Sequence, residues 1–159
     1  MRHLFPLMSQ LWLVPLLGVA IPGTAQIQHI TPFTGTWKLK LEKSRFNPGP
    51  PFQSFTLTFA PDGARHLDLV HADGRNLKAA LPWSDGKEVH VKANLGQKNI
   101  TAVSRIKGKA FRDTWRDGGK IIEKVHGALF SDGKALSITV DGTDGQGHSY
   151  QNQLTFEKQ

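Results

Sequence analysis

Residues 54–81 read SFTLTFAPDGARHLDLVHADGRNLKAAL, and this stretch shows the pattern that decides the fold. Apolar side chains alternate with polar ones in three short runs, which is the period of a half-buried β-strand. Asp62-Gly63 and Asp73-Gly74 separate the runs. Asp-Gly is typical of two-residue hairpin turns, because glycine tolerates positive φ and aspartate hydrogen-bonds its own backbone. The stretch therefore predicts three antiparallel strands joined by tight hairpins.

The same rhythm extends over the rest of the chain. Turn signals follow at intervals of 10 to 15 residues, at Asp85-Gly86, Gly96, Gly108, Asp117-Gly118, Asp132-Gly133 and Asp144-Gly145. The runs between them alternate in the same way, and none has a helical period. We therefore predict an all-β fold, an antiparallel up-and-down meander of about ten strands. A long meander removes its exposed edges by closing into a barrel. Strands this short, with few aromatic residues, exclude an outer-membrane barrel.

The first 25 residues have the three parts of a secretory signal peptide. Arg2 gives a short positive start, the run 11–21 is apolar, and Gly23-Thr24-Ala25 offers small residues for cleavage. A retained membrane anchor is the alternative, but the apolar stretch is short and broken by proline. We expect 1–25 to be a signal peptide removed near its last residue, and 26–159 to be a single domain. The mature protein would then be exported, either to the periplasm or out of the cell.

Composition limits the kind of protein this can be. The expected mature chain has 134 residues, a net charge of +6 and no cysteine. This length suits one domain with its own core, and disulfides and a lipidated cysteine are excluded. The positive balance favours attraction to an anionic surface such as the cell envelope. Because the basic residues are spread over nearly every strand, they indicate a solvated outer face. We expect a monomer with no nucleic-acid partner.

One segment, residues 44–53, breaks the rhythm of strands and turns. It contains three prolines and a glycine, which fit neither a strand interior nor a helix. A stiff connector is one interpretation. A fixed lid over one mouth of the barrel, with Phe46 and Phe52 pointing inward, is the other.

The start of the first strand carries a family resemblance. Phe33-Thr34-Gly35-Thr36-Trp37 resembles the Gly-x-Trp signature of lipocalins and related calycin-type barrels. Together with segments 43–50, 131–134, 142–147 and 156–159, it makes the chain similar to a group of small exported bacterial proteins with lipocalin-like barrels, largely of unassigned function. The resemblance implies that Trp37 plugs the closed end of the barrel. It also implies that an Arg or Lys from a late strand packs over this ring.

The chain also departs from one related group of barrels. Intracellular fatty-acid-binding barrels have two helices after the first strand and often hold a carboxylate with an Arg-x-Tyr pair on the last strand. The proline segment leaves no room for such helices, and residues 153–158 contain no such pair. A fatty-acid site therefore cannot be carried over from that group residue by residue.

No constellation of catalytic or metal-binding residues is visible. Glu88-x-His90 and Glu123-x-x-His126 are two candidate ligand pairs. Zinc needs three or four ligands, and both pairs fall on positions predicted to face outward. Neither a hydrolase triad nor a phosphate-binding loop is present. We expect no metal, no cofactor and no enzymatic activity.

Asp113 is the anomaly of the alternating pattern. It lies between Phe111 and Trp115, so strict alternation points it inward. An inward carboxylate needs a polar partner, but the nearby arginines alternate outward. Either a bulge or a wrong phase returns Asp113 to water, or Asp113 is a polar anchor inside a ligand cavity.

We interpret the protein as an exported, non-enzymatic β-barrel that binds a small apolar or amphipathic ligand in its interior. The candidate ligand-binding residues are Trp37, Phe55, Phe59, Leu69, Phe111, Asp113, Trp115 and Ile138. Small inward residues at Ala79, Ala93, Ala102 and Ser104 would leave space beside them. The alternative is a solid barrel or sandwich whose surface binds envelope polymer or another protein. The volume of the interior separates the two hypotheses.

Overall fold

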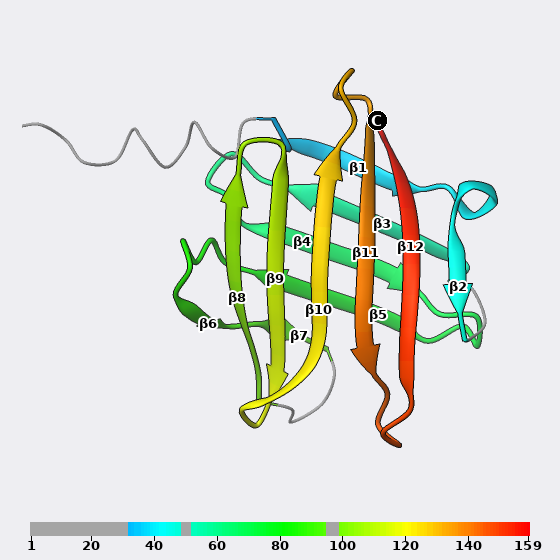
Figure 1. The fold of residues 1–159 in the computed structure, drawn as a ribbon, viewed down its shortest axis with the longest axis vertical. Coiled ribbons are helices and arrows are strands. Elements are labelled where there is room, and N and C mark those ends of the chain that lie inside the picture. The colour runs from blue at the N-terminus through cyan, green and yellow to red at the C-terminus, as the bar shows by residue number, and fades with distance from the viewer. Residues whose placement is uncertain (1–31, 49–51, 95–98) are drawn as a thin grey trace, which may run out of the picture.

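The computed structural model describes residues 32–48, 52–94 and 99–159, which form one antiparallel β-sheet (Figure 1). The elements are β1 (Gly35–Leu39), the 3-10 turn η1 (Leu41–Lys43), β2 (Arg45–Asn47), β3 (Ser54–Phe59), β4 (Arg65–Val70), β5 (Asn76–Leu81), β6 (Glu88–His90), β7 (Lys92–Ala93), β8 (Ile100–Lys107), β9 (Ala110–Asp117), β10 (Lys120–Leu129), β11 (Ala135–Thr143) and β12 (Ser149–Lys158). The predicted all-β antiparallel meander is confirmed. The described residues contain no helix long and apolar enough to cross a membrane.

The sheet is closed by one extended segment that belongs to both of its edges. The strand order is β6-β8-β9-β10-β11-β12-β1-β3-β4-β5-β7, with the short β2 paired to β12. β6 pairs with β8 and β7 pairs with β5, and between them the Val91 N–H donates to the Ile100 carbonyl at 2.9 Å. Residues 88–93 thus behave as one bent strand that joins the two edges. The described residues form twelve strands rather than the predicted ten, because this strand is divided and because β2 is an extra short one.

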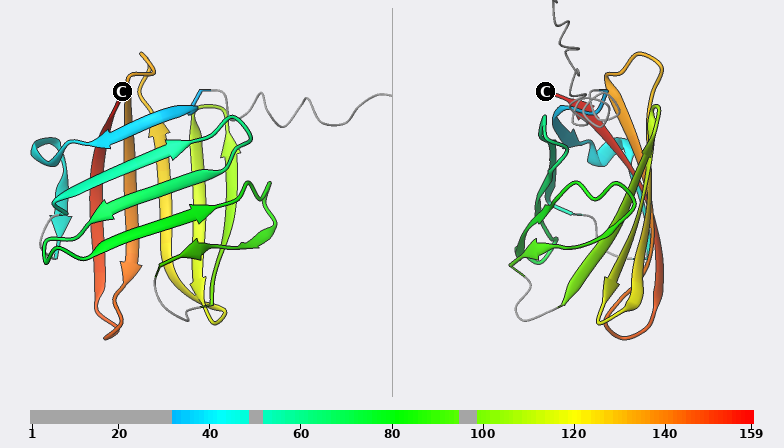
Figure 2. Two further views of the ribbon diagram at one scale, coloured as in Figure 1. Left: turned by 180° about the vertical axis from the view of Figure 1, so that it is seen from behind. Right: turned by 90° about the vertical axis from the view of Figure 1, so that its left-hand side faces the viewer.

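The barrel is flattened into two faces. β8 to β12 form one face and β1, β3, β4 and β5 the other, and the strands of the two faces cross steeply (Figure 1). The faces lie together near β1 and stand apart near β5 and β7 (Figure 2). The barrel therefore has a closed end at β1 and an open end opposite it.

The hairpins that contain Asp62-Gly63, Asp73-Gly74 and Asp132-Gly133 are longer than predicted, whereas the one after Asp117 has the predicted two residues. Residues 61–63 form a three-residue loop in which Gly63 has φ 86° and Asp62 Oδ1 accepts a hydrogen bond from the Ala64 N–H at 3.0 Å. Gly74 and Gly133 also have positive φ, and the aspartates before them accept the same bond. Aspartate closes the turn and glycine takes the left-handed position that follows it, as in three-residue hairpins with a bulge. Two-residue hairpins occur instead at 108–109 and 118–119.

Trp37 plugs the closed end, as the resemblance implies. It is 0% exposed, and its Nε1–H donates to the Phe33 carbonyl at 2.7 Å. Lys158 of the last strand places Nζ 5.3 Å from the centre of the Trp37 ring system. Phe59 and Phe156, both at most 1% exposed, help to fill the same end. The closed end is therefore a dense aromatic core.

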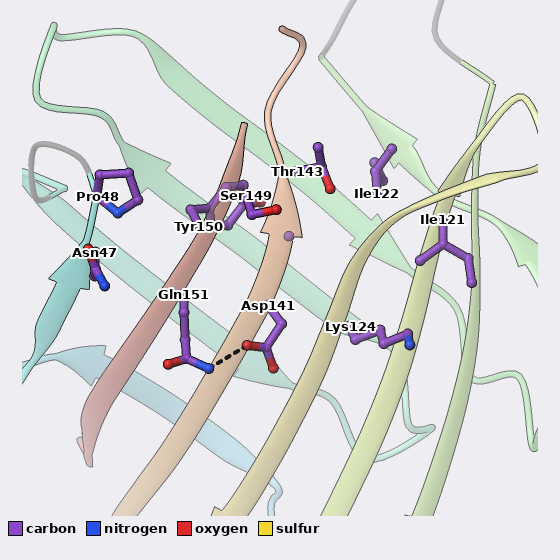
Figure 3. Close-up of a pocket in the computed structure, with 11 residues that line it drawn as sticks. Asn47, Pro48, Ile121, Ile122, Lys124, Asp141, Thr143, Ser149, Tyr150 and Gln151 are labelled. Carbon is purple, nitrogen blue, oxygen red and sulfur yellow. Dashed lines mark hydrogen bonds between the residues drawn. The ribbon is translucent and has the colours of Figure 1, made fainter. Parts of the chain in front are cut away.

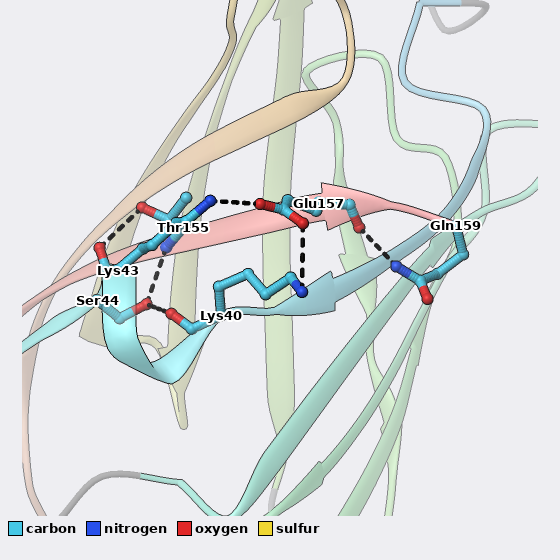
Figure 4. A network of polar contacts seen from close by, with 6 residues as sticks. All are labelled: Lys40, Lys43, Ser44, Thr155, Glu157 and Gln159. Carbon is cyan, nitrogen blue, oxygen red and sulfur yellow. Dashed lines mark hydrogen bonds and ion pairs between the residues drawn. The ribbon is translucent and has the colours of Figure 1, made fainter.

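A polar network ties η1 to the last strand (Figure 4). Glu157 accepts ion pairs from Lys40 at 3.2 Å and Lys43 at 2.6 Å. Ser44 Oγ donates to the Lys40 carbonyl at 2.7 Å and accepts from the Thr155 N–H at 3.0 Å. These contacts fix the start of the proline-containing segment, of which residues 49–51 lie outside the described residues.

Candidate functional site: a cavity between the two faces

A cavity of about 610 Å³ lies between the two faces of the barrel. This volume falls within the range of small-molecule sites, about 300–1,000 Å³. Most of the lining is apolar and comes from β3, β4, β5, β9, β10 and β11. The polar side chains on the lining are Arg65, His71, Arg75, Asp113, Glu123, Asp144, Tyr150 and Asn152. The interior is therefore not solid, and the cavity has the composition of a site for an apolar or amphipathic molecule.

Six of the eight predicted site residues line this cavity: Phe55, Leu69, Phe111, Asp113, Trp115 and Ile138. Trp37 and Phe59 do not, because both lie in the aromatic core of the closed end. Of the small inward residues, Ala79 and Ala93 line the cavity. Ala102 and Ser104 are 0% exposed and packed, so they leave no space for a ligand.

Asp113 faces inward, and its partner is Arg65 from the opposite face of the barrel. The two side chains are 3% and 5% exposed. Arg65 donates from Nη1 to Asp113 Oδ2 at 2.6 Å and from Nη2 to Oδ1 at 2.9 Å. Arg65 Nη2 also donates to Ser104 Oγ at 2.8 Å. The interpretation that placed Asp113 in water is therefore wrong, because a bidentate ion pair compensates its burial.

This ion pair forms the floor of the cavity. The Arg65 guanidinium carbon lies 5.6 Å from the Phe59 ring centre and 5.1 Å from that of Phe111, within range of cation–π attraction. The Phe59 and Phe111 rings also meet edge to face at 5.7 Å. Arg65 thus separates the aromatic core of the closed end from the cavity above it.

A β-bulge turns Glu123 into the cavity. The register between β9 and β10 shifts between Ile121 and Glu123, with Ile122 as the extra residue. After the shift Glu123 lies opposite Trp115 and lines the cavity, whereas Ile121 is 43% exposed on the outside. The prediction that Glu123 faces outward is therefore wrong, because a bulge reverses the phase of one strand relative to its partner.

Tyr150 reaches Glu123 from two strands away. Its hydroxyl donates to Glu123 Oε1, and its ring crosses Gly142 of the strand between them. A Cβ on Gly142 would lie 2.4 Å from the Tyr150 ring, so only glycine leaves room for this contact. Burial raises the pKa of the Glu123 carboxyl, and the bond from Tyr150 offsets only part of this. Burial also raises the pKa of the Tyr150 hydroxyl, and the nearby Glu123 charge adds to the effect.

Aromatic side chains surround the mouth of the cavity. Phe46 and Phe52, on either side of the proline segment, both line it, and their ring centres lie 5.8 Å apart. Phe52 also meets Phe55 at 5.8 Å and His71 at 5.6 Å. The inward direction expected for Phe46 and Phe52 in a lid is thus observed for the described residues.

A shallower groove adjoins the mouth on the outside (Figure 3). It lies between β2 and the strands β10 to β12, and Gln151 donates to Asp141 across it at 2.7 Å. Pro48, Ile122 and Tyr150 line both this groove and the cavity. Tyr150 is therefore a rim residue, at the boundary between the interior and the outer surface.

Of the polar residues on the lining, sequence reasoning predicted only Asp113, although Arg65, Tyr150 and Glu123 carried a signal. Arg65 has the same parity as the inward Leu67 and Leu69 on its strand. Tyr150 shares its parity with Leu154 in the same way. Glu123 likewise has the parity of Val125, which also lines the cavity, and of the buried Leu129; the bulge breaks this alternation only towards Ile121.

Neither metal nor nucleophile chemistry finds a supporting cluster in the part of the chain that the structure describes. No group of three or more His, Cys, Asp or Glu side chains is placed to hold a metal ion there. The described residues that line the cavity include no Ser, Thr or Cys.

Comparison with known proteins identifies the fold. No protein-family model matches the chain, and no curated sequence matches it significantly. A crystal structure of the zebrafish ileal bile acid-binding protein complexed with cholic acid is similar, with a TM-score of 0.50 and 11% sequence identity. The match covers 80% of this chain and 99% of that one. It shows a calycin-type β-barrel and agrees with the predicted calycin resemblance at the level of the fold.

Proposed function

We propose that the protein is a non-enzymatic binding protein that holds a small apolar or amphipathic molecule inside its barrel. The observation that carries this proposal is the 610 Å³ cavity, with its apolar walls and few polar groups. We further propose that the protein acts outside the cytoplasm after removal of residues 1–25, which have the pattern of a signal peptide.

The arrangement of the polar groups supports an amphipathic ligand. One polar pair, Arg65 with Asp113, lies at the floor, and another, Glu123 with Tyr150, lies near the mouth. A few placed polar groups in an apolar cavity fix the orientation of a ligand. The similar zebrafish protein was solved with cholic acid, a molecule of this kind.

The size of the cavity allows measurable affinity. A ligand that buries about 300 Å² of apolar surface gains roughly 7 kcal/mol at about 25 cal/mol per Å². Because immobilising the ligand costs part of this gain, and 1 μM corresponds to about 8 and 1 mM to about 4 kcal/mol, the expected dissociation constant lies between about 1 μM and 1 mM.

The test is a titration with the neutral fluorescent probe N-phenyl-1-naphthylamine. We expect saturable binding with quenching of tryptophan emission, because Trp115 lines the cavity. Leu77→Trp and Ala79→Phe fill the cavity and should weaken binding at least tenfold. Ala80→Phe is the matched control, since Ala80 is next in sequence but does not line the cavity.

Two results would contradict the proposal. The first is a wild-type protein that binds no apolar probe. The second is equal loss of binding in the Ala80→Phe control, which would place the probe on the outer surface. Leu77→Trp keeps the test valid should Ala79→Phe fail to fold, because Leu77 is only half-buried near the mouth.

A surface function is the second candidate, and one observation favours it. Arg105 and Arg112 lie directly opposite each other on the outer face of β8 and β9, and His126 lies opposite Arg112 on β10. These side chains line an outer groove of about 520 Å³. Like charges directly opposite each other are unfavourable, and a bound anion would relieve the repulsion. Arg112→Gln should then weaken binding to vesicles that contain anionic lipid and leave probe binding unchanged.

A further inference from the structure

The positive charge of Arg65 at the floor of the cavity is already neutralised by Asp113. Asp113 receives two hydrogen bonds from Arg65, and Ser104 receives a third. A ligand carboxylate at the floor would have to displace Asp113 or place a second negative charge beside it. Both are costly where the two side chains are at most 5% exposed. The floor therefore discourages an anionic head group.

The Arg75 and His71 side chains at the mouth are no better placed than Arg65 to bind an anion. Arg75 is bonded to Asp73 at 2.6 Å, and its side chain is 75% exposed. The His71 ring meets the Phe52 ring edge to face at 5.6 Å. Exposed charges of this kind attract a ligand weakly, because water and salt screen them.

Among the residues that the structure describes, three acidic side chains line the cavity: Asp113 is paired with Arg65, Asp144 lies 3.2 Å from the exposed His148, and Glu123 has no basic side chain beside it. It is half-buried, it lines the cavity, and its partner is the uncharged Tyr150 hydroxyl. It forms no ion pair with any residue that the structure describes. Burial without a neighbouring positive charge raises the pKa of this carboxyl. A cation beside it would stabilise the ionised form.

Building on the binding function proposed above, we propose that the cavity selects amphiphiles with a cationic amine head group, and that Glu123 binds this group near the mouth. Glu123 lies opposite Trp115 in the sheet. Asp113 lies opposite Val125, two residues further along each strand towards the floor of the cavity. The head group would thus stay near the rim while the apolar tail lies between the two faces. Tyr150 holds the carboxylate in place from the other side.

The net positive charge of the protein opposes the binding of a cation. The whole chain carries a net charge of +7, which attracts anions and repels cations at long range. A preference for a cationic ligand would therefore run against the charge of the protein. Such a preference must come from the site itself.

Three probes with the same tail and different heads test the proposal: dodecylammonium, dodecanol and dodecanoate, each below its micelle-forming concentration. Isothermal titration near neutral pH should show dodecylammonium binding at least tenfold more tightly than dodecanoate. Glu123→Gln should reduce the ammonium affinity to within about threefold of dodecanol. Glutamine keeps an acceptor for Tyr150, so this variant should fold. Glu88→Gln is the matched control, because Glu88 lies on the outer face and is exposed.

The outcomes separate this inference from the function on which it rests. Dodecanoate binding most tightly overturns the inference but leaves a ligand-binding barrel. Failure of all three probes to bind refutes the binding function as well. An ammonium preference that persists in Glu123→Gln, or that is lost in Glu88→Gln, shows that Glu123 is not its source. Tyr150→Phe gives a second check, since it retains Glu123 and should retain the preference.

Discussion

Removing the negative charge of the buried Arg65–Asp113 pair is the perturbation that best tests the structure. Asp113→Asn keeps the shape of the side chain but leaves the Arg65 guanidinium without its counter-charge. It also turns an amide N–H₂ toward one of the two donors that now meet Asp113 at 2.6 and 2.9 Å. Ser104, at 2.8 Å from Nη2, would be the polar contact that remains at that nitrogen.

The expected cost follows from the burial of the pair. Breaking a buried ion pair by removing one partner costs about 3–5 kcal/mol, because the other charge stays buried and uncompensated. Arg65 borders the cavity, where water can approach it, so we expect a value near the lower limit. Ser104→Ala removes a single bond to a charged group and should cost less, about 1.5–3 kcal/mol.

Urea unfolding of four proteins provides the assay. With an m-value of about 1–3 kcal/mol/M, Asp113→Asn should lower the midpoint by roughly 1–3 M. The double variant Arg65→Met with Asp113→Leu removes both charges and should be close to wild type or about 1–4 kcal/mol more stable. If Asp113→Asn costs less than Ser104→Ala, or if the double variant is less stable than Asp113→Asn, the pair is not the buried, mutually compensating unit described here.

Three further predictions concern the plug, the bulge and the N-terminus. Trp37→Ala should cost about 3–5 kcal/mol in denaturant unfolding, because the ring is fully buried in the closed end; a loss below about 1 kcal/mol contradicts this. Burial raises the pKa of Glu123 above its ordinary 4.5, so the native state keeps a proton that the unfolded chain has released. Stability should therefore fall as pH rises from about 4.5 towards the raised value, and Glu123→Gln should remove this fall in urea midpoints measured from about pH 4 to 8; a rise over the same interval in the wild type has the wrong sign. Mature protein from the exported fraction should begin at Gln26 or close to it by N-terminal mass analysis, and an intact Met1 there would identify the segment as an anchor.

The strands and their inward faces were predictable from the sequence because alternation is a local property. Phe55, Phe111 and Ile138 face inward for this reason, and the turn glycines mark where each run ends. Asp113 could be placed inward by the same rule, but its partner Arg65 lies 48 residues away. The contact between Arg65 and Asp113 depends on how the two faces of the barrel cross. Alternation within each strand does not predict that crossing.

The bulge at Ile122 shows the limit of periodicity more clearly. One extra residue puts Ile121 out of phase with Glu123, Val125 and Leu129, so the apolar Ile121 lies outside whereas the acidic Glu123 faces inward. The contact between Glu123 and Tyr150 also depends on Gly142, because a side chain at this position would overlap the Tyr150 ring. The bulge and the Gly142–Tyr150 contact each involve a neighbouring strand. No pattern within a single strand therefore predicts either of them.

The strand that closes the barrel is also its weakest seam. β7 pairs with β5 through only Ala79↔Ala93 and Ala80↔Lys92, and the Asn94 side chain extends this ladder by bonding to the backbone of Lys78 at 2.7 Å. A short ladder opens at low free energy, so the amides of this seam should exchange hydrogen for deuterium before those of β9 to β12. Such opening would widen the barrel between β5 and β7 and would give a ligand of the proposed kind a second route, apart from the one beside Phe46 and Phe52. A disulfide between cysteines at positions 80 and 92 should therefore slow ligand release far more than it changes affinity.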